Sequence, residues 1–240
     1  MAPAEWAADA RILWRLVRGR TRGGNHAASL QDFYAPQAER YDAFRARLLH
    51  GRQELVDRLG IRQGEHVVEL GGGTGHGLDL LAPRLPALAH YDLVDLCPAL
   101  LDVARKKLRP GWPVKLHEAD ATTWQPRTKA DVVFLSYALT MIPDWPALID
   151  NTYAMLAPGG RIGLVDFHLP AAGHRWANGF WRTWFGHDGV QLSEQHLPAL
   201  ERRFDVVYRS ERRAAIPYLP GIRAPYYLFV GRRGGHVPQP

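Results

Sequence analysis

The chain has 240 residues, of which 46% are hydrophobic, enough for one complete core. Its single cysteine, Cys97, excludes an internal disulfide and indicates a reducing compartment, with the thiol packed as a small apolar group. No apolar run approaches the roughly 18 residues of a membrane-spanning helix, and three arginines near the N-terminus interrupt any signal-peptide core. The 11 histidines are scattered without paired Cys/His spacing, so we expect no metal.

The first 22 residues carry basic side chains at helical spacing. On a helix that turns ~100° per residue, four arginines share a wedge of roughly 60°, and apolar residues face the other way. These arginines are Arg11, Arg15, Arg18 and Arg22. With a net charge of +6 and a pI of about 9.7, the pattern predicts a helix on an anionic membrane surface. The alternative is a helix that docks on its own domain. No nucleic-acid partner is expected, because no RNA-binding module accompanies the arginines.

Aromatic and basic residues are interleaved over residues 32–52. We interpret residues 1–50 as a basic, amphipathic N-terminal helical arm or lid, and residues 51–235 as the main domain. This segment includes Tyr34, Tyr41 and Arg45.

A glycine-rich turn at Gly71–Gly75 follows an apolar run and precedes leucines at helical spacing. This predicts a strand, a tight turn and a helix start. Glycine tolerates positive φ and has no Cβ, so a ligand can approach the backbone, where N–H groups at the helix start face it. The dinucleotide pattern G-x-G-x-x-G requires a third glycine where this chain has His76, and a P-loop Gly-Lys-Ser/Thr is missing.

Two further apolar runs end in a carboxylate. Asp95 ends the strand expected over residues 90–95, roughly 20 residues after the last glycine of the turn, where it can accept hydrogen bonds from ribose hydroxyls. Its alternative role is the N-cap of a helix over residues 98–108. Asp120 lies at the end of the strand expected over residues 114–121, and its alternative role is to cap the following turn.

The rest of the chain continues the alternation of strands and helices. We expect strands over residues 131–136, 161–168, 205–210 and 226–232, and a helix between Trp145 and Leu156. This alternation predicts an α/β fold, in which a mostly parallel sheet is covered on both faces. A proline-rich connection between the last two strands favours a hairpin with an antiparallel final strand. The glycine turn, both aspartates and Ser136–Tyr137 all fall at carboxyl strand ends, where ligands bind in such sheets.

Together with Glu69, the glycine turn resembles motif I of the class I S-adenosylmethionine-dependent methyltransferases, [D/E]-x-G-x-G-x-G. The resemblance implies a Rossmann-like, seven-stranded sheet of order 3-2-1-4-5-7-6. It also implies S-adenosyl-L-methionine as cofactor and S-adenosyl-L-homocysteine as product, with adenine recognised at Asp120 and at the next backbone N–H. The cofactor-binding residues so implied are Glu69, Gly71, Gly73, Gly75, Asp95, Leu96, Asp120, Ala121 and Ser136.

Two segments, residues 32–52 and residues 136–145, resemble the bacterial betaine-lipid (diacylglyceryl-homoserine) N-methyltransferases, within a likeness over about residues 30–232. The resemblance implies three methylations of a headgroup amine. Tyr34, Tyr41 and Tyr137 are then candidates for an aromatic wall around the cationic headgroup. Arg45 is the candidate for the homoserine carboxylate and His168 for a proton acceptor or pocket wall. The alternatives are packing tyrosines, a surface arginine and a strand-end histidine with ordinary partners.

Five aromatic residues lie within residues 176–185, either over the acceptor site at a membrane interface or simply packed on the sheet. We therefore expect a cytoplasmic enzyme, peripheral at the inner face of the membrane, that acts on an amino-lipid.

Ser136-Tyr-Ala-Leu139 differs from the Asn/Asp-Pro-Pro-Tyr of methyltransferases that act on DNA bases or glutamine amides. The alternatives are a phosphatidylethanolamine N-methyltransferase, a quinone or small-molecule C-methyltransferase, or a non-catalytic module that binds a nucleotide, RNA or lipid.

Overall fold

The structure is a computed structural model that describes residues 49–169, 179, 181, 190–216 and 221–234. Tyr34, Tyr41, Arg45 and the basic segment over residues 1–22 lie outside the described residues, as does most of the aromatic segment 176–185. None of the helices within the described ranges is both long enough and apolar enough to cross a membrane.

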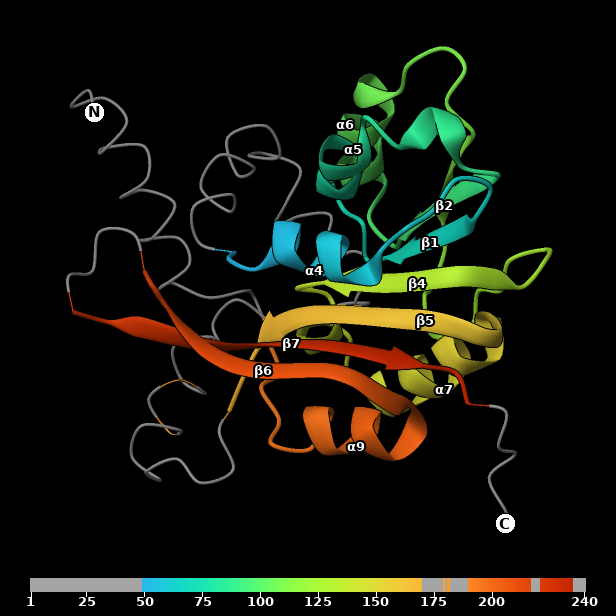
Figure 1. Ribbon diagram of the computed structural model, residues 1–240. Helices are drawn as coiled ribbons and strands as arrows, with labels where there is room; N and C mark the ends of the chain where they lie inside the picture. Colours follow the sequence, from blue (N-terminus) through green and yellow to red (C-terminus); the bar gives the residue numbers. More distant parts are fainter. Residues whose placement is uncertain (1–48, 170–178, 180, 182–189, 217–220, 235–240) are drawn as a thin grey trace, which may run out of the picture.

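The described strands form a seven-stranded sheet of order β3-β2-β1-β4-β5-β7-β6, which confirms the expected order (Figure 1). Strands β1 to β5 are parallel, whereas β7 runs antiparallel to β5 and β6 antiparallel to β7. The expected antiparallel hairpin is therefore present. The strands are β1 (His66–Leu70), β2 (His90–Asp95), β3 (Val114–Glu118), β4 (Ala130–Ser136), β5 (Leu156–Phe167), β6 (Asp205–Ala215) and β7 (Arg223–Arg232).

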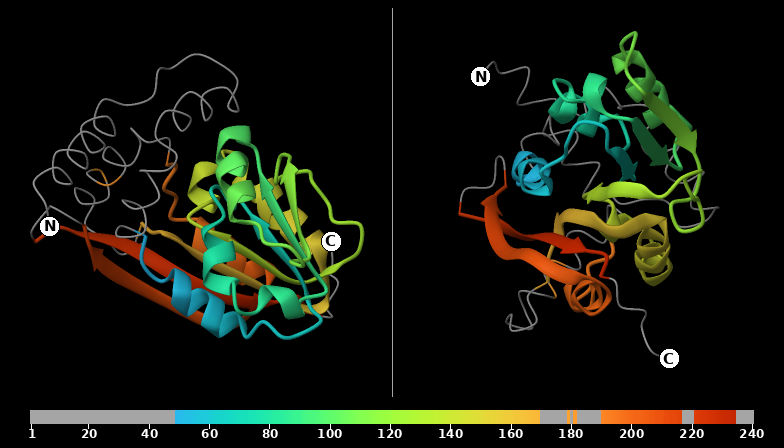
Figure 2. Two further views of the ribbon diagram at one scale, coloured as in Figure 1. Left: turned by 90° about the horizontal axis from the view of Figure 1, so that it is seen from above. Right: turned by 45° about the vertical axis from the view of Figure 1, so that its right-hand side comes forward.

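Helices cover both faces of this sheet (Figure 2). One face carries α4 (Arg52–Leu59), α5 (His76–Leu81) and α6 (Pro98–Lys107). The other face carries α7 (Trp145–Met155) and α9 (His196–Arg203). Two 3-10 turns, η1 (Leu85–Ala87) and η2 (Leu139–Met141), complete the described elements. Helix α5 is shorter than its leucine spacing predicts, because Pro83 and Pro86 lack the N–H groups that would continue it.

The core consists of two apolar layers, one on each side of the sheet. Leucines of α4 and α5 pack on the first face, and leucines of α7 and α9 pack on the second. Strand β1 is buried on both faces, as expected for a central strand of a parallel sheet. Both layers hold the carboxyl ends of β1, β2 and β4 at one edge, where the polar residues of the site gather.

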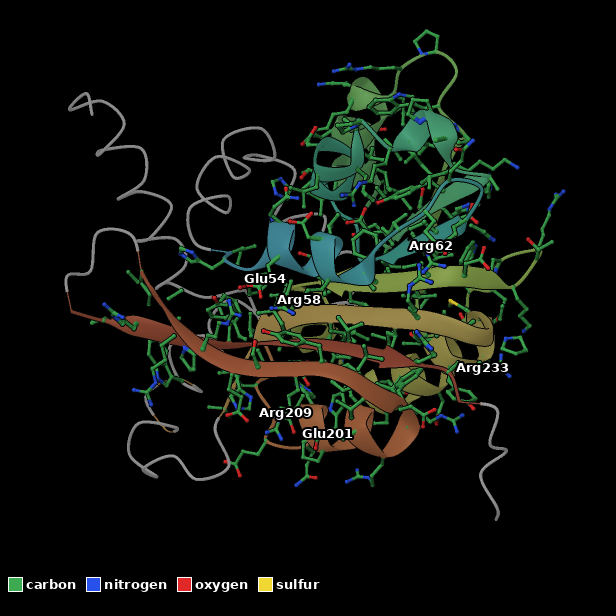
Figure 3. The ribbon with its side chains drawn as sticks, in the orientation of Figure 1. Glu54, Arg58, Arg62, Glu201, Arg209 and Arg233 are labelled. Atoms are coloured by element: carbon green, nitrogen blue, oxygen red, sulfur yellow. The ribbon has the colours of Figure 1, made fainter. Side chains whose placement is uncertain are left out.

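Ion pairs connect α4 and α9 to the edge strand β6 (Figure 3). Glu54 on α4 accepts hydrogen bonds from Arg58 Nε and Arg212 Nη2, each at 2.8 Å. On α9, Glu201 Oε1 lies 3.0 Å from Arg209 Nη1. These groups are partly exposed, and pairs of this kind each contribute about 1 kcal/mol or less. They orient the two helices, while the apolar layers supply most of the stability.

Candidate functional site

The turn between β1 and α5 requires glycine for conformational reasons. Gly71, Gly73 and Gly75 have φ values of 67°, 54° and 74°, a region that side chains disfavour. The N–H of Gly71 donates to Val94 O at 2.8 Å, which anchors the turn to β2. A Cβ at Gly71 would lie 2.5 Å from the Cβ of Ala138, so the turn and the end of β4 can meet only without a side chain.

Gly75 has a different function in the fold from its two neighbours. A Cβ at this position would lie 2.9 Å from Leu78 Cδ1 and 3.1 Å from Ala104 Cβ. Gly75 therefore allows α5 and α6 to pack closely, and it lines neither of the two hollows described below. A direct contact between Gly75 and a cofactor stays a prediction.

The Asp95 carboxylate is held between the glycine turn and the start of α6. The Gly73 N–H donates to its Oδ2 at 2.8 Å, and the Cys97 N–H donates to its Oδ1 at 2.9 Å. The N-cap residue of α6 is Cys97, and no side chain caps this helix. Asp95 is therefore not the N-cap of α6, which was its alternative role. Instead, two backbone N–H groups fix its carboxylate at the end of β2.

A cavity of about 370 Å³ opens beside this carboxylate, within the roughly 300–1,000 Å³ of small-molecule sites. The cavity is lined by residues at or just after the carboxyl ends of four neighbouring strands, and these residues form both polar and apolar walls. Those that bear on the predicted site are Gly71, Gly73, Asp95, Leu96, Asp120, Ala121 and Tyr137. The fold therefore brings together six of the nine expected cofactor-binding residues, together with one expected substrate-positioning tyrosine.

Asp120 caps a turn and lines the cavity at the same time. Its Oδ1 accepts hydrogen bonds from the Thr122 N–H at 2.8 Å and the Thr122 hydroxyl at 2.7 Å. The next residue, Ala121, is fixed through its carbonyl, which accepts a hydrogen bond from Asn151 Nδ2 at 2.8 Å. The two roles weighed for Asp120 are therefore compatible, because the turn that it caps is a wall of the cavity.

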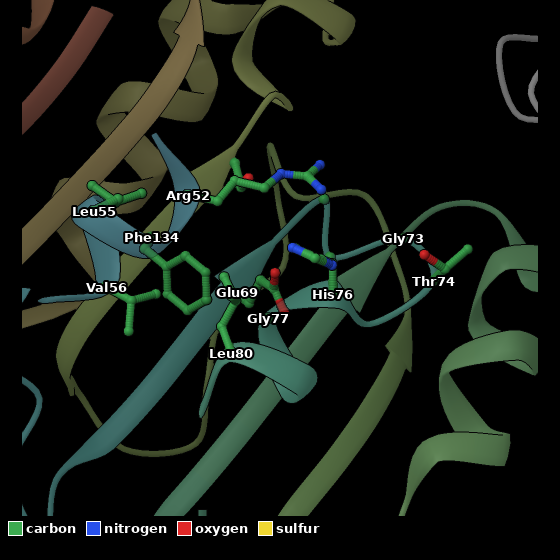
Figure 4. Close-up of a pocket in the computed structure, with 13 residues that line it drawn as sticks. Arg52, Leu55, Val56, Glu69, Gly73, Thr74, His76, Gly77, Leu80 and Phe134 are labelled. Atoms are coloured by element: carbon green, nitrogen blue, oxygen red, sulfur yellow. The ribbon is translucent and has the colours of Figure 1, made fainter. Parts of the chain in front are cut away.

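A smaller hollow of about 30 Å³ lies on the other side of the glycine turn, and Gly71 and Gly73 line both hollows. Arg52, Glu69 and His76 line the smaller hollow (Figure 4). Glu69 is buried and accepts a hydrogen bond from the Tyr91 hydroxyl at 2.6 Å. Burial raises the pKa of Glu69 to about 7, although the hydrogen bond from Tyr91 opposes this shift. Glu69 thus provides an ionisable group that titrates near neutral pH.

Ser136 also lines the smaller hollow, and its hydroxyl oxygen is buried without a hydrogen-bond partner among the described residues. A buried hydroxyl without a partner is costly, and such a group at a cavity wall suits a polar ligand atom. This placement agrees with the position of Ser136 at the carboxyl end of β4.

Tyr137 links the large cavity to the chain that leads into α4. Its backbone is strained, with a φ of 56°. Its hydroxyl donates to the carbonyl of His50 at 2.7 Å, and its ring packs against Phe167 with centroids 4.8 Å apart. The guanidinium carbon of Arg52 lies 5.6 Å from the centre of the same ring. The sequence pattern assigned no role to Arg52; its position at the end of the aromatic-basic segment 32–52 was the available signal.

His168 lies apart from both hollows. Its Nε2 is 2.9 Å from Glu211 Oε2 on β6, and its ring packs on Tyr227. Burial lowers the pKa of His168, while Glu211 acts in the opposite direction. The structure thus gives this histidine a strand-end partner, and its proposed role near the acceptor stays a prediction.

The two hollows fit the cofactor that motif I implies. The bare backbone at Gly71 and Gly73 and the fixed carboxylate of Asp95 supply a close-approach surface and polar contacts for a nucleoside, and the buried hydroxyl of Ser136 supplies a polar contact in the smaller hollow. Apolar wall comes from Leu100 and Ile142. These features match the contacts that S-adenosylmethionine would need on either side of the turn.

Curated proteins with similar sequences include methyltransferases of more than one kind. The chain is 35% identical over 113 residues to the trans-aconitate 2-methyltransferase of Variovorax paradoxus, covering 47% of this chain and 42% of that protein. It is 27% identical over 152 residues to the ubiquinone/menaquinone biosynthesis C-methyltransferase UbiE of Vibrio vulnificus, covering 60% and 58%. The chain thus spans about half the length of the curated relatives it matches.

A solved structure has the same fold. Haemonchus contortus phosphoethanolamine N-methyltransferase 2, in complex with S-adenosyl-L-methionine, superposes with a TM-score of 0.64 at 14% identity, covering 89% of this chain and 61% of that one. A family model described as a methyltransferase domain matches residues 40–205, well over half of the chain. The chain therefore belongs to the methyltransferase-domain family, and its sheet has the class I S-adenosylmethionine-dependent methyltransferase fold.

Proposed function

We propose that this protein is an S-adenosylmethionine-dependent N-methyltransferase that acts on the amine of a lipid headgroup. The observation that carries the proposal is the Asp95 carboxylate, held 2.8 Å from the Gly73 nitrogen on the wall of a cavity that Asp120 also lines. When bound, S-adenosylmethionine supplies an electrophilic methyl group and leaves as neutral S-adenosylhomocysteine.

Residues of the large cavity divide the recognition of the nucleoside. Asp95 accepts hydrogen bonds from the ribose hydroxyls, for which its carboxylate is already oriented by two backbone donors. Asp120 accepts a hydrogen bond from the adenine amino group, and the Ala121 N–H donates a hydrogen bond to the ring. Leu96 and Ile142 provide apolar contact. Gly71 keeps the backbone bare at the turn, where a Cβ would already touch Ala138.

Residues of the smaller hollow suit the amino-acid end of the cofactor. Arg52 offers a positive charge for its carboxylate, and Glu69 offers a negative charge for its ammonium group. The Ser136 hydroxyl supplies a further polar contact. Because an ammonium group stabilises ionised Glu69, we expect cofactor binding to lower the pKa of this residue below about 7.

For the acceptor, the protein has to align an uncharged amine with the methyl group and exclude water. The Tyr137 ring at the cavity wall is one aromatic face for a headgroup that becomes cationic as methyl groups accumulate. Tyr34 and Tyr41 would extend this wall, Arg45 would bind a headgroup carboxylate, and His168 would accept a proton. The likeness of residues 32–52 and 136–145 to betaine-lipid N-methyltransferases favours diacylglyceryl-homoserine as the acceptor.

A quinone acceptor is the second candidate, and the identity to UbiE over 60% of the chain favours it. Phosphatidylethanolamine is a third acceptor, with a phosphate where diacylglyceryl-homoserine has a carboxylate. For any lipid acceptor we place the protein on an anionic membrane surface at the cytoplasmic side, through the basic segment over residues 1–22.

Labelling of lipids in cells distinguishes these acceptors. Cells with and without the gene are fed methyl-labelled methionine, and their lipids are separated by thin-layer chromatography. We expect a labelled, zwitterionic lipid without phosphorus that depends on the gene and disappears with Asp95→Asn. Gene-dependent label in phosphatidylcholine would instead identify phosphatidylethanolamine as the acceptor, and label in quinone would identify a quinone. No gene-dependent methyl label in lipid or quinone, with RNA recovered on the protein, would favour a non-catalytic binding module.

A further inference from the structure

Three histidines and an aspartate converge on the sheet, away from the glycine turn. His66 and His90 are the first residues of β1 and β2, and they are register partners. Asp92 follows on the same face of β2, because side chains two apart on a strand share a face. His117 on β3 pairs with Val94 and so shares this face. The register of three neighbouring strands therefore assembles the cluster.

All three imidazoles approach the same carboxylate. The Nε2 atom of His66 lies 2.8 Å from Asp92 Oδ2. The Nε2 atoms of His90 and His117 lie 2.9 Å and 2.7 Å from Asp92 Oδ1. The possible ligand atoms of His66, His90 and Asp92 all lie within 4.8 Å of one another. Around a tetrahedral zinc ion, ligand atoms are about 3.3 Å apart, so small side-chain rotations would bring the ligand atoms of His66, His90 and Asp92 to coordination spacing, and His117 approaches them through its contact with Asp92 Oδ1.

The surroundings of the cluster suit a bound cation. The side chains of His66 and Asp92 are only 8% and 5% exposed, whereas those of His90 and His117 are 30% and 27% exposed and leave a route from solvent. Thr128 Oγ1 lies 3.4 Å from Nδ1 of His66. This hydroxyl is placed to accept a hydrogen bond from the Nδ1–H of an imidazole whose Nε2 binds a metal, a common outer contact of metal-bound histidine.

We propose that His66, His90, Asp92 and His117 bind one divalent transition-metal ion, and that Zn²⁺ is the ion. Three imidazole nitrogens and one carboxylate oxygen form a four-coordinate donor set that zinc accepts. Protein ligands occupy all four positions, which is typical of a structural ion. None of the four residues lines either hollow at the glycine turn. The ion therefore cross-links β1, β2 and the edge strand β3, independently of the methyl-transfer site.

Zinc binding is tested with the full-length, untagged chain after removal of metal by a chelator. Isothermal titration with Zn²⁺ gives stoichiometry and affinity, and Co²⁺ is the spectroscopic probe because tetrahedral Co²⁺ absorbs strongly in the visible range. The variants are His90→Asn and His117→Asn, whose side chains are the more exposed ones of the cluster. The matched control is His50→Asn, at an exposed histidine outside the cluster.

We expect one Zn²⁺ per chain, a visible Co²⁺ spectrum that Zn²⁺ abolishes, and at least a tenfold weaker affinity in each cluster variant. The His50→Asn variant should bind zinc like the unmodified chain. Equal zinc affinity in the control and in both cluster variants would overturn the proposal, as would the absence of saturable binding. The cluster would then be a hydrogen-bonded group of imidazoles around a carboxylate.

A measurement on the unmodified protein covers the case in which a variant fails to fold. Zinc K-edge X-ray absorption of the zinc-loaded chain should show a four-coordinate ion with imidazole scattering from about three ligands. A spectrum with only oxygen neighbours overturns the site. Thermal unfolding supplies a second readout, because an ion that binds the folded state alone raises Tm with its concentration.

Discussion

Asp95 is the residue on which cofactor recognition depends most directly. Its carboxylate accepts two backbone hydrogen bonds and still lines the large cavity. A carboxylate held in this way needs no rearrangement before it accepts ribose hydroxyls, so the entropic cost of binding is low.

We expect Asp95→Asn to weaken S-adenosylmethionine binding by roughly tenfold to a hundredfold, because hydrogen bonds to a charged acceptor are lost. Calorimetry with purified protein measures this. The matched control is Asp102→Asn on α6, an exposed aspartate paired with Arg105. Similar affinity in both variants would remove Asp95 from the site.

Glu69 makes the stability of the fold depend on pH. Burial raises its pKa from 4.5 to about 7, so the folded protein binds this proton more tightly than the unfolded chain does. The contribution of this proton is complete below about pH 4.5 and is lost as the pH rises towards about 7. Asp166, whose pKa burial raises to about 6, acts in the same direction.

Glu69→Gln removes the first of these contributions and leaves the second. From about pH 5 to about pH 8, the free energy of unfolding of the wild type should fall by roughly 2–3 kcal/mol more than that of the variant. Urea unfolding at both pH values measures the difference. Parallel pH profiles for the two proteins would show that folding does not raise the pKa of Glu69.

At the scale of elements, the turn between β1 and α5 combines two constraints on one residue. Gly71 has a positive φ, and its Cβ position is already occupied by Ala138. Gly111 also has a positive φ, of 84°, but a Cβ there would meet nothing within 4 Å. Substitutions at the two glycines therefore distinguish the effect of backbone strain from the effect of steric overlap.

Gly71→Ala should lower the free energy of unfolding by about 1–3 kcal/mol more than Gly111→Ala, since only the first overfills a packed contact. Gly71→Ala should also abolish measurable S-adenosylmethionine binding, whereas Gly111→Ala should leave it intact. Urea unfolding and calorimetry test both statements. Normal cofactor affinity in Gly71→Ala would show that the cofactor does not approach this turn.

The strand predictions were accurate for β2 and too short for the C-terminal hairpin. β2 matches its expected range, whereas β6 and β7 form a longer hairpin than the apolar residues indicate. β6 is an edge strand whose residues alternate between exposed and half-buried, so its charged end carries no apolar signal. β5 begins before its expected start, because Pro158-Gly-Gly160 lies within the strand near a register shift rather than in a separating turn.

At the scale of the whole molecule, the net charge of +6 and the arginines over residues 1–22 favour association with anionic surfaces. Each such arginine near an anionic membrane contributes about 1 kcal/mol. Deletion of residues 1–22 should therefore weaken sedimentation with anionic vesicles at least about tenfold.

The same deletion should leave S-adenosylmethionine affinity unchanged, because the described residues that line both hollows begin at Arg52. Neutral vesicles serve as the control, and added salt should reduce binding of the full-length chain only. Equal sedimentation of both chains with anionic vesicles would locate membrane contact elsewhere or exclude it.

The sequence by itself determined the fold class, the glycine turn and the two strand-end carboxylates. These features depend on apolar periodicity and on glycine's backbone freedom, which contiguous residues encode. Only the tertiary structure decided that the Tyr137 hydroxyl meets His50, that Arg52 and Glu69 line one hollow, and that three scattered histidines surround Asp92. Such contacts follow from strand register and helix placement, so residues far apart in the chain become neighbours although no local sequence pattern predicts the contact.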